Sequence, residues 1–400
     1  MWSIGARGDA PMSGALEGLT VLALEQATTL PFLTYRLACD GARVIRVENP
    51  QRPDPNRFVG RDVLSEPSMR AYFLPNNGGK EAITLNLASA EGRALLHDLV
   101  RRMPVDVLAT NQRPRSYASL GIDEPTLRAV RRDLIWLGIS GFGPDHDEPA
   151  YDPVLQARAG FMALTGEPDG PPTPFGAPMV DLGAAEHAYG EVMKALYRRA
   201  KTGEGARIDV AMFRSAVSWL VAPFVVESLG ERVTRRGSGH QFFAPVGVHA
   251  TRDGHVYLAV GNDAQWKSLA ALPAFAGIDL PEYAVNAGRI VDAARLHAAL
   301  GERLARLTTD EALALLRGAE VPVARVATLP DVMADPLVAP RLMRVRDPRT
   351  GLTIALPPPP VGDPPALTFP PRLGEHNERV YGALGLSPAQ IAALHARGVI

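Results

Sequence analysis

The sequence predicts an α/β protein whose main domain is a Rossmann-like parallel sheet. Short, continuously apolar runs alternate with helical segments through the first half of the chain. Such runs are typical of strands in a parallel sheet that is covered on both faces. The chain also has 400 residues and 46% hydrophobic content, which is enough for a large core and more than one domain.

Six apolar runs predict the strands of this sheet. Helices are expected between them: one from Phe32 to Gly41, one that Ser89 caps, one after Asp123 and a long one over 182–201. The GxGxxG fingerprint of dinucleotide-binding folds does not join the first strand to its helix. The six expected strands are residues 19–25, 43–49, 81–87, 105–111, 134–140 and 206–212.

The second half of the chain predicts a different unit. A helical run over 215–230 leads to a strand at 254–262. Two helices follow, and Thr308 and Glu311 stand at the spacing of a capping box before the second of them. A run at 321–327 closes this unit, and a proline-rich stretch then leads to a final helix with Ser387 as its N-cap.

Composition excludes several function classes. A net charge of −1 and a pI of about 6.8 disfavour nucleic-acid or membrane-surface binding. The single cysteine, Cys39, cannot form an internal disulfide and fits a reducing compartment such as the cytoplasm. The nine histidines show no metal-binding spacing, so we expect no metal. Residues 1–14 lack an apolar signal-peptide core and are expected to be a loose extension.

Asp181 stands at the start of the long helix, after a Gly- and Pro-rich stretch over 167–178. An aspartate there is usually a helix cap. The free N–H groups and the helix dipole also favour its ionised form, and a positioned carboxylate can attack an activated carbonyl. The residues alone leave both roles open.

Other polar residues carry weaker signals. Tyr151 and Asp152 could orient a substrate or simply form a buried hydrogen bond. The Gly-rich loop 237–245 could be a mobile lid or a linker. Ligands of open parallel sheets bind at the carboxyl ends of the strands. Five basic residues fall at or near expected strand ends and could serve there or be surface charges: Arg43, Arg46, Lys80, Arg113 and Arg115.

Eight segments, in this order, resemble the class III coenzyme A transferases, the CaiB/BaiF family. The similarity extends over about residues 15–400, and the order makes it specific although each segment alone is weak. The segments are LEGLTVLALEQATTLPF, LACDGARVIRVENP, NNGGKEAITLNL, DVLATNQRP with LGI, GISGFGP, TGEPDGPPTPFGAPMVDLGAA, ALYRRAKTGEGARIDVAMF and LGEHN.

The resemblance implies the domain organisation. A large CoA-binding α/β domain would comprise 1–225 and 330–400, and a small α+β domain 226–329. Two subunits would interlock like links of a chain, with the active site between them. We expect a homodimer as the default, and a heteromer stays open.

The resemblance also implies the reaction. Asp181 falls on the family's nucleophile, which attacks an acyl-CoA and then carries CoA as an aspartyl thioester until an acceptor acid takes it. No metal, ATP or permanently bound cofactor is needed, because the CoA thioester is itself the substrate. The motifs are most similar to members that use C4 and C5 dicarboxylates, with succinyl-CoA as donor.

Further site residues come from the same resemblance. Thr28, Tyr151 and Asp152 match substrate-binding positions, although the family's Ala-Gly-Pro is here Thr29-Leu30-Pro31. Several positions that contact CoA are basic in other members and are not basic here, so Arg46, Arg113 or Arg115 would supply the phosphate contacts. The expected CoA-binding positions are Asn49, Leu85, Ala88, Asn111, Gln112 and Ser119.

Two alternatives remain. The α-methylacyl-CoA racemases have the same fold, but they pair the aspartate with a histidine in a Gly-His-Asp stretch, where this chain has Ala150-Tyr151-Asp152. A tyrosine with a pKa of about 10 is a poor substitute for imidazole, so transfer is favoured over racemisation. A silent subunit of a heteromeric enzyme is the non-catalytic alternative, and the presence of Asp181 disfavours it.

Overall fold

The computed structural model describes residues 14–400, so nearly all of the expected N-terminal extension lies outside it. The described chain divides into two compact units. The first contains residues up to 159 together with 176–220 and 336–400, and the second contains 160–175 and 221–335. The domain boundaries expected near residues 225 and 330 stay a prediction.

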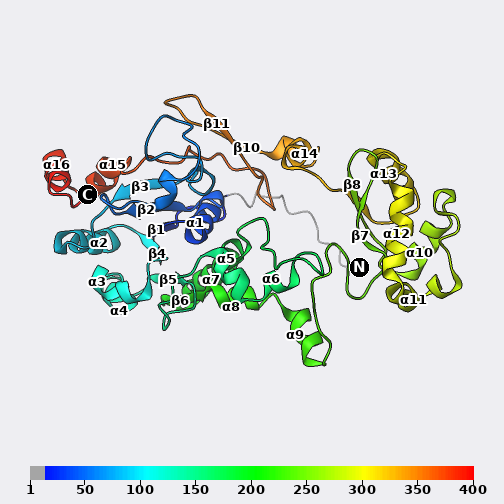
Figure 1. Cartoon of the computed structure of the whole chain (residues 1–400). Coiled ribbons are helices and arrows are strands. Elements are labelled where there is room, and N and C mark those ends of the chain that lie inside the picture. Colours follow the sequence, from blue (N-terminus) through cyan, green and yellow to red (C-terminus); the bar gives the residue numbers. More distant parts are fainter. Residues whose placement is uncertain (1–13) are drawn as a thin grey trace. The chain divides into compact units, whose positions relative to one another are not determined.

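The first unit is built on a six-stranded parallel sheet (Figure 1). The strands occur in the order β3-β2-β1-β4-β5-β6, which is the order of Rossmann folds. Each of the six expected strands is present. Their bounds are β1 Thr20–Leu24, β2 Arg43–Glu48, β3 Glu81–Thr84, β4 Val105–Thr110, β5 Ile135–Ser140 and β6 Ala206–Ala211.

Helices from both ends of the chain cover one face of this sheet. Helix α2 (Ala90–Arg102) begins where Ser89 Oγ accepts a hydrogen bond from the Gly92 N–H at 2.9 Å. The predicted Ser89 cap is thus confirmed, and the expected helix after Asp123 is α4 (Glu124–Val130), which Asp123 caps in the same way. The C-terminal helices α15 (Asn377–Ala383) and α16 (Pro388–Ala396) add their leucine, valine and tyrosine side chains to the same core.

Helices α1 (Thr29–Cys39) and α7 (Met179–Thr202) pack against each other beside the sheet. Their buried side chains lie outside the core that α2 helps to form. Helix α7 ends at Gly203, which adopts the left-handed conformation that favours glycine. The chain direction places the start of α7 at the carboxyl edge of the sheet, just after β5 and before β6.

The C-terminal segment also covers the β3 edge of the sheet. The Ala82 N–H donates to His376 Nδ1 at 3.0 Å, and the Thr84 N–H donates to Asn377 Oδ1 at 2.9 Å. An antiparallel hairpin, β10 (Met343–Arg346) and β11 (Thr353–Leu356), precedes this segment. The edge strand therefore has its outward N–H groups paired within the chain.

The second unit contains a three-stranded antiparallel sheet. Strand β7 (Val246–Ala250) pairs with β8 (His255–Ala259), which pairs with β9 (Val323–Arg325). Helices α10 (Asp263–Ala270), α12 (Ala293–Leu304) and α13 (Thr309–Gly318) supply most of the helical side chains in its apolar core. The capping box predicted from Thr308 and Glu311 is confirmed. Strand β7 was not predicted.

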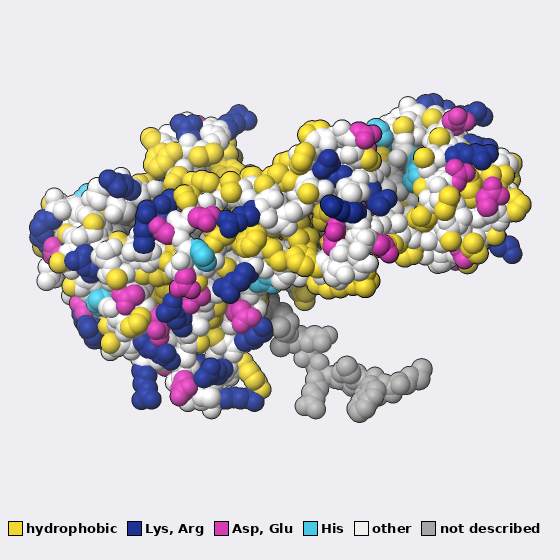
Figure 2. All heavy atoms as spheres, turned by 60° about the horizontal axis from the view of Figure 1, so that its bottom comes forward, with side chains coloured by type: hydrophobic (Ala, Val, Ile, Leu, Met, Phe, Trp, Pro, Cys, Tyr) yellow, Lys and Arg dark blue, Asp and Glu magenta, His cyan; other side chains and the backbone are white. Residues whose placement is uncertain are grey.

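The helical run expected over 215–230 is two helices, α8 (Met212–Val217) and α9 (Val221–Ser228). Pro223 explains the break, because proline lacks an N–H and clashes with a preceding helical turn. No residue of α9 is buried, and Val221, Phe224 and Val225 are more than half exposed. Hydrophobic side chains gather on the face of the molecule turned forward in Figure 2.

The remaining helices are short. None of the helices between residues 14 and 400 combines the length and apolar character needed to cross a membrane. Their bounds are α3 Tyr117–Leu120, α5 Asp152–Arg158, α6 Phe161–Leu164, α11 Asn286–Val291 and α14 Leu329–Ala334.

Candidate active site

The N-terminus of α7 is capped by Asp152 and not by Asp181. Asp152 Oδ1 accepts hydrogen bonds from the Val180 N–H at 2.6 Å and the Asp181 N–H at 3.1 Å. Gln156 Nε2 donates to the other oxygen at 2.6 Å. Asp181 is the third residue of the helix, and its own side chain caps nothing. The carboxylate of Asp181 is therefore free for another role.

The Asp181 carboxylate faces the start of α1. Thr29 Oγ1 donates a hydrogen bond to Asp181 Oδ1 at 2.5 Å. The Thr29 side chain is buried and also lies 3.7 Å from the sulfur of Met212, the residue that follows β6. Segments after β1, β5 and β6 thus meet at Asp181, at the carboxyl edge of the sheet.

Burial raises the pKa of Asp181 to about 6. The Thr29 hydrogen bond lowers the pKa, and the nearby Asp152 carboxylate raises it again. The carboxylate is consequently ionised at neutral pH but poorly solvated. A positioned, poorly solvated carboxylate has the properties that a nucleophile needs.

The loop between β1 and α1 is fixed from both sides. Gln26 exchanges two backbone hydrogen bonds with the Asn111 side chain, at 3.1 and 2.8 Å. The Ala27 N–H donates to Asp54 Oδ1 at 3.0 Å, and Asn56 Nδ2 donates to the Ala27 carbonyl at 2.8 Å. These contacts hold Ala27 at a φ of 62°, a conformation that alanine rarely adopts. The loop therefore delivers Thr29 to Asp181 in a defined geometry.

Of the three predicted substrate-binding residues, two lie next to Asp181 or its partner. Thr28 is buried at the N-cap of α1, adjacent to Thr29. Asp152 is buried beneath the start of α7. Tyr151, by contrast, is 73% exposed and stands at the N-cap of α5. Within residues 14–400 no histidine side chain is hydrogen-bonded to Asp181, which accepts its bond from Thr29.

The predicted CoA-binding positions are distributed along the carboxyl edge. Asn49 follows β2, and Asn111 and Gln112 follow β4. Leu85 follows β3, but its side chain is buried in the core, which leaves only its backbone for a ligand. Ala88 is exposed in the turn before α2, and Ser119 is exposed on α3. These positions follow β2, β3 and β4 along the chain, and their contact with CoA stays a prediction.

The expectation that Arg46 binds phosphate is wrong. Its side chain is fully buried, with Nη2 3.0 Å from Asp54 Oδ2 and Nε 3.0 Å from Glu48 Oε2. Lys80 is buried as well, with its ammonium 2.7 Å from Glu25 Oε1. Arg43 lies at the amino end of β2 and pairs with Glu81. Of the five basic candidates, only Arg113 and Arg115 are both exposed and located after the carboxyl end of a strand, which is β4.

These buried groups form one ionic cluster beneath the site loop. It contains three acids and three bases, so its formal charges balance: Glu25, Glu48, Asp54, Arg46, Arg57 and Lys80. The neighbouring Arg46 and Arg57 outweigh burial and hold the pKa of Glu48 at about 2. Burial lowers the pKa of Lys80 to about 8. Asp54 belongs both to this cluster and to the loop that carries Thr29.

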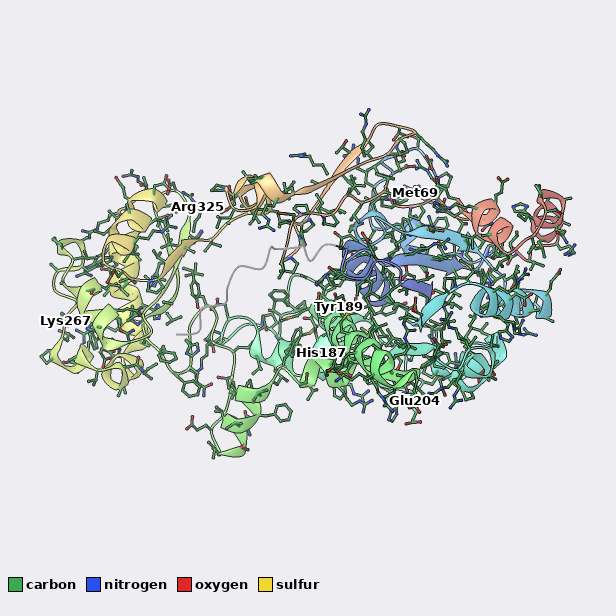
Figure 3. All side chains as sticks on the ribbon, turned by 180° about the vertical axis from the view of Figure 1, so that it is seen from behind. Met69, His187, Tyr189, Glu204, Lys267 and Arg325 are labelled. Carbon is green, nitrogen blue, oxygen red and sulfur yellow. The ribbon has the colours of Figure 1, made fainter. Side chains whose placement is uncertain are left out.

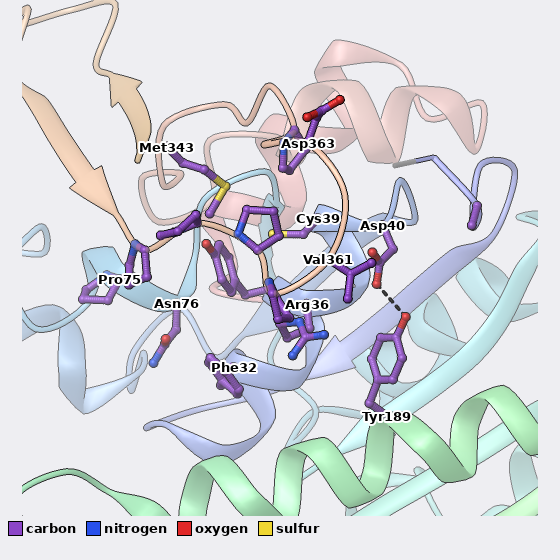
Figure 4. A pocket seen from close by; sticks show the side chains of 17 residues that line it. Phe32, Arg36, Cys39, Asp40, Pro75, Asn76, Tyr189, Met343, Val361 and Asp363 are labelled. Atoms are coloured by element: carbon purple, nitrogen blue, oxygen red, sulfur yellow. Dashed lines mark hydrogen bonds between the residues drawn. The ribbon is translucent and has the colours of Figure 1, made fainter. Parts of the chain in front are cut away.

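A separate cavity of about 480 Å³ lies further along α1 and α7 (Figure 4). It is bounded by Phe32 and Tyr35 of α1, the proline-rich stretch 357–360 and Tyr189 of α7. Tyr189, which projects from α7 near His187 (Figure 3), donates a hydrogen bond to Asp40 Oδ2 at 2.5 Å. Neither Thr29 nor Asp181 lines this cavity.

Thr29 and Asp54 are site residues that the sequence analysis missed. Thr29 carried one usable signal, because it replaces the small residue of the family's Ala-Gly-Pro motif. Asp54 carried no such signal, since aspartate is a common residue in the turns of a Pro-rich loop.

Known proteins match the chain over most of its length. A succinate–glutarate CoA-transferase of Agrobacterium fabrum is 32% identical, with 82% of this chain and 84% of that protein aligned. A succinyl-CoA:mesaconate CoA-transferase of Haloarcula marismortui is 34% identical over 82% of this chain and 85% of that protein. The crystal structure of a CaiB/BaiF family protein from Brucella suis superposes with a TM-score of 0.83 at 32% identity, covering 93% of this chain and all of that one.

The family model for CoA-transferase family III matches residues 16–377. This range includes all of the second unit, the first unit as far as residue 377 and every residue of the Asp181 site. The chain is therefore a member of CoA-transferase family III, and it is a CoA-transferase.

Proposed function

We propose that this enzyme transfers CoA from succinyl-CoA to a C4 or C5 dicarboxylate through an aspartyl-CoA thioester on Asp181. The observation that carries the proposal is the state of the Asp181 carboxylate. It is poorly solvated, has a raised pKa of about 6 and is held by Thr29 at the edge where ligands of such sheets bind.

The reaction begins when Asp181 Oδ2 attacks the thioester carbonyl of the donor. A C–O bond forms, the C–S bond breaks and CoA leaves as a thiolate. The thiolate then attacks the aspartyl carbonyl carbon, forms the aspartyl-CoA thioester and releases the donor acid with Oδ2 in its carboxylate. The acceptor carboxylate then attacks the same carbon, a C–O bond forms and the C–S bond breaks, which releases CoA as a thiolate again. The thiolate attacks the acceptor's carbonyl in this second anhydride, which gives the new acyl-CoA and returns Asp181 as a carboxylate.

The substrate class comes from the relatives. The two named above act on succinate with glutarate and on succinyl-CoA with mesaconate. All of these acids are dicarboxylates of four or five carbons. We expect Thr28, Tyr151 and Asp152 to contact the acid or support its pocket. CoA would lie along Asn49, Leu85, Ala88, Asn111, Gln112 and Ser119, with the exposed Arg113 and Arg115 near its phosphates.

The assembly we propose is an interlocked homodimer in the cytoplasm. Each subunit would combine the large CoA-binding domain with the small domain, and the active site would lie between subunits. The exposed apolar side chains of α9 support a second copy, because Val221, Phe224 and Val225 are each more than half exposed and such a patch needs a partner surface. The single Cys39 is consistent with a reducing compartment.

The test is to mix the purified protein with succinyl-CoA and to measure the mass of the intact protein by mass spectrometry. We expect an adduct that contains CoA, located at Asp181 by hydroxylamine trapping and peptide mapping. Glutarate, mesaconate, citramalate, itaconate and malate are then added singly, with oxalate as a shorter dicarboxylate. The expected result is that one of the C4 or C5 acids discharges the adduct and appears as its CoA thioester.

Asp181→Ala provides the decisive variant, since it removes the nucleophile without introducing a residue that deamidation could convert back to aspartate. It should keep its fold and form no adduct. Substantial turnover by Asp181→Ala would contradict covalent catalysis at this residue. Wild-type protein that forms no adduct but exchanges the α-proton of a 2-methylacyl-CoA would instead be a racemase.

A further inference from the structure

We propose that the Thr29 hydroxyl is a catalytic group that stabilises the oxyanion formed on Asp181 Oδ1. This inference rests on the proposed function, because the oxyanion forms only if Asp181 is the covalent nucleophile. Thr29 then has a specific task, which is to assist each attack on the aspartyl carbonyl carbon.

The geometry supports this role. Thr29 Oγ1 is 2.5 Å from Asp181 Oδ1, the length of a charge-assisted O–H···O⁻ hydrogen bond. Bonding to Oδ1 leaves Oδ2 as the oxygen that attacks the donor. After that attack, Oδ2 bridges the anhydride and Oδ1 is the carbonyl oxygen of the aspartyl group, still next to Thr29.

Negative charge appears on Oδ1 each time the aspartyl carbon is attacked, and a hydrogen-bond donor at Oδ1 stabilises that charge. In the anhydride and in the thioester, Oδ1 is an uncharged carbonyl oxygen. When the CoA thiolate or the acceptor carboxylate attacks the aspartyl carbon, the electron pair of the C=O bond moves onto Oδ1. When the tetrahedral intermediate collapses, the electron pair returns to the C=O bond and the leaving group is expelled. A fixed donor at Oδ1 therefore binds these transition states more strongly than the intermediates.

The backbone N–H groups in the first turn of α7 are already occupied. The N–H groups of Val180 and Asp181 both donate to Asp152 Oδ1. Between residues 14 and 400 the Asp181 carboxylate accepts one hydrogen bond, and it comes from Thr29. The start of α7 thus contributes its dipole, while the directed hydrogen bond to Oδ1 comes from the hydroxyl.

Thr29 is also held rigidly, as a preorganised donor must be. It is the first residue of α1 and its side chain is buried. The loop before it is fixed by Asn111 at Gln26 and by Asp54 and Asn56 at Ala27. Little reorganisation is required at the moment of attack.

The test compares Thr29→Val with Thr29→Ser. Valine keeps the shape of threonine and replaces the hydroxyl by a methyl group, whereas serine keeps the hydroxyl. The rate of aspartyl-CoA thioester formation is measured in single turnovers with succinyl-CoA, by quenching and intact mass. Steady-state kcat and KM are measured with the acceptor found for the wild type.

We expect Thr29→Val to form the thioester and turn over about 100-fold more slowly, as for the loss of one oxyanion donor. Its KM should change little, because the hydroxyl contacts the nucleophile and not the free substrate. Thr29→Ser should keep most of the wild-type rate. Thr29→Val should also move the acid limb of the pH–rate profile to higher pH, because Thr29 lowers the pKa of Asp181.

The outcomes separate this inference from the function on which it rests. A Thr29→Val enzyme that forms thioester at the wild-type rate overturns the role of Thr29 and leaves the function intact. If the serine and valine variants lost the same fraction of the wild-type rate, the role of the hydroxyl would also be overturned. The loss would then come from altered packing of the side chain and not from the missing hydrogen bond. If the valine variant does not fold, Thr29→Ala makes the same comparison. A wild type without any thioester would refute the function itself.

Discussion

Two aspartates meet at the start of α7, Asp181 within that helix and Asp152 on α5, and their surroundings give them different tasks. Asp152 accepts three hydrogen bonds, two of them from backbone N–H groups of the helix. Asp181 accepts one, from a hydroxyl, and burial raises its pKa. Hydrogen bonds to the charged form hold one carboxylate in a structural role, and partial desolvation prepares the other for reaction.

The raised pKa of Asp181 predicts a stability cost at neutral pH. Its value is 3.8 in the unfolded chain and about 6 in the folded one. The folded state binds the proton more tightly, so stability is lost as the pH rises from about 4 through 6. We expect Asp181→Ala to be more stable than wild type by about 1–3 kcal/mol at pH 7.5, with a smaller difference at pH 5.

Urea unfolding at the two pH values checks this expectation and needs no substrate. Asp169→Ala, at an exposed position, is the matched control and should change neither curve. An Asp181→Ala variant that is less stable than wild type at pH 7.5 would contradict the idea that ionised Asp181 destabilises the folded state.

At this scale the sequence revealed Asp181 but not its partner. An aspartate at a helix start after a Gly- and Pro-rich stretch is visible locally. The hydrogen bond from Thr29 joins residues 152 positions apart and depends on how α1 packs on α7. Arg46 was misjudged for a related reason, since the sequence shows a basic residue in a strand but not the three acids around it.

Among the elements, α7 has an unusual start. Its N-cap residue is Pro178, which offers no capping side chain, and the cap comes from Asp152 on α5. A cap supplied from another helix ties the position of α5 to that of α7. The contact therefore fixes the backbone beneath Asp181 as well as satisfying two N–H groups.

We predict that Asp152→Ala lowers stability by about 1–2 kcal/mol, the usual effect of losing an N-cap. It should also lower the pKa of Asp181, because a like charge is removed, and it should reduce activity through the loosened helix start. Urea unfolding and the pH–rate profile measure the two effects.

Thr308→Ala is the control for this variant. It removes the cap of α13 in the other unit and should cost similar stability with unchanged activity. An Asp152→Ala enzyme with the wild-type pH profile would show that Asp152 does not influence Asp181.

The prediction of helices and strands succeeded where a buried run is bounded by residues that typically cap or end an element. Five of the six parallel strands are buried along almost their whole length, whereas β6 is only partly buried. The caps at Ser89, Thr308 and Ser387 are recognisable from the sequence. Strand β7 was missed because its residues alternate between buried and exposed over only five positions beside a Gly-rich loop. The split between α8 and α9 depended on Pro223, whose effect was underestimated.

On the scale of the whole molecule, the two units differ in how the chain builds them. Nearly all of the second unit is one continuous stretch, 221–335, with a core of its own. The first unit needs both chain ends, because α15 and α16 complete the core that α2 and the sheet begin.

We therefore predict that a fragment of residues 221–335 folds alone, with a cooperative thermal transition in circular dichroism. A fragment ending at residue 220 should not fold, because the core side chains of α15 and α16 are missing. A 221–335 fragment without a cooperative transition, or a folded fragment ending at 220, would contradict this division.

The pairing of His376 and Asn377 with the edge of β3 has a consequence for synthesis of the protein. Until His376 and Asn377 have left the ribosome, the outward N–H groups of Ala82 and Thr84 have no partner in the chain. A nascent sheet with an open edge can pair with another nascent chain. The edge of β3 is therefore open from the time β3 leaves the ribosome until His376 and Asn377 do, and a chain truncated before residue 376 would leave it unpaired.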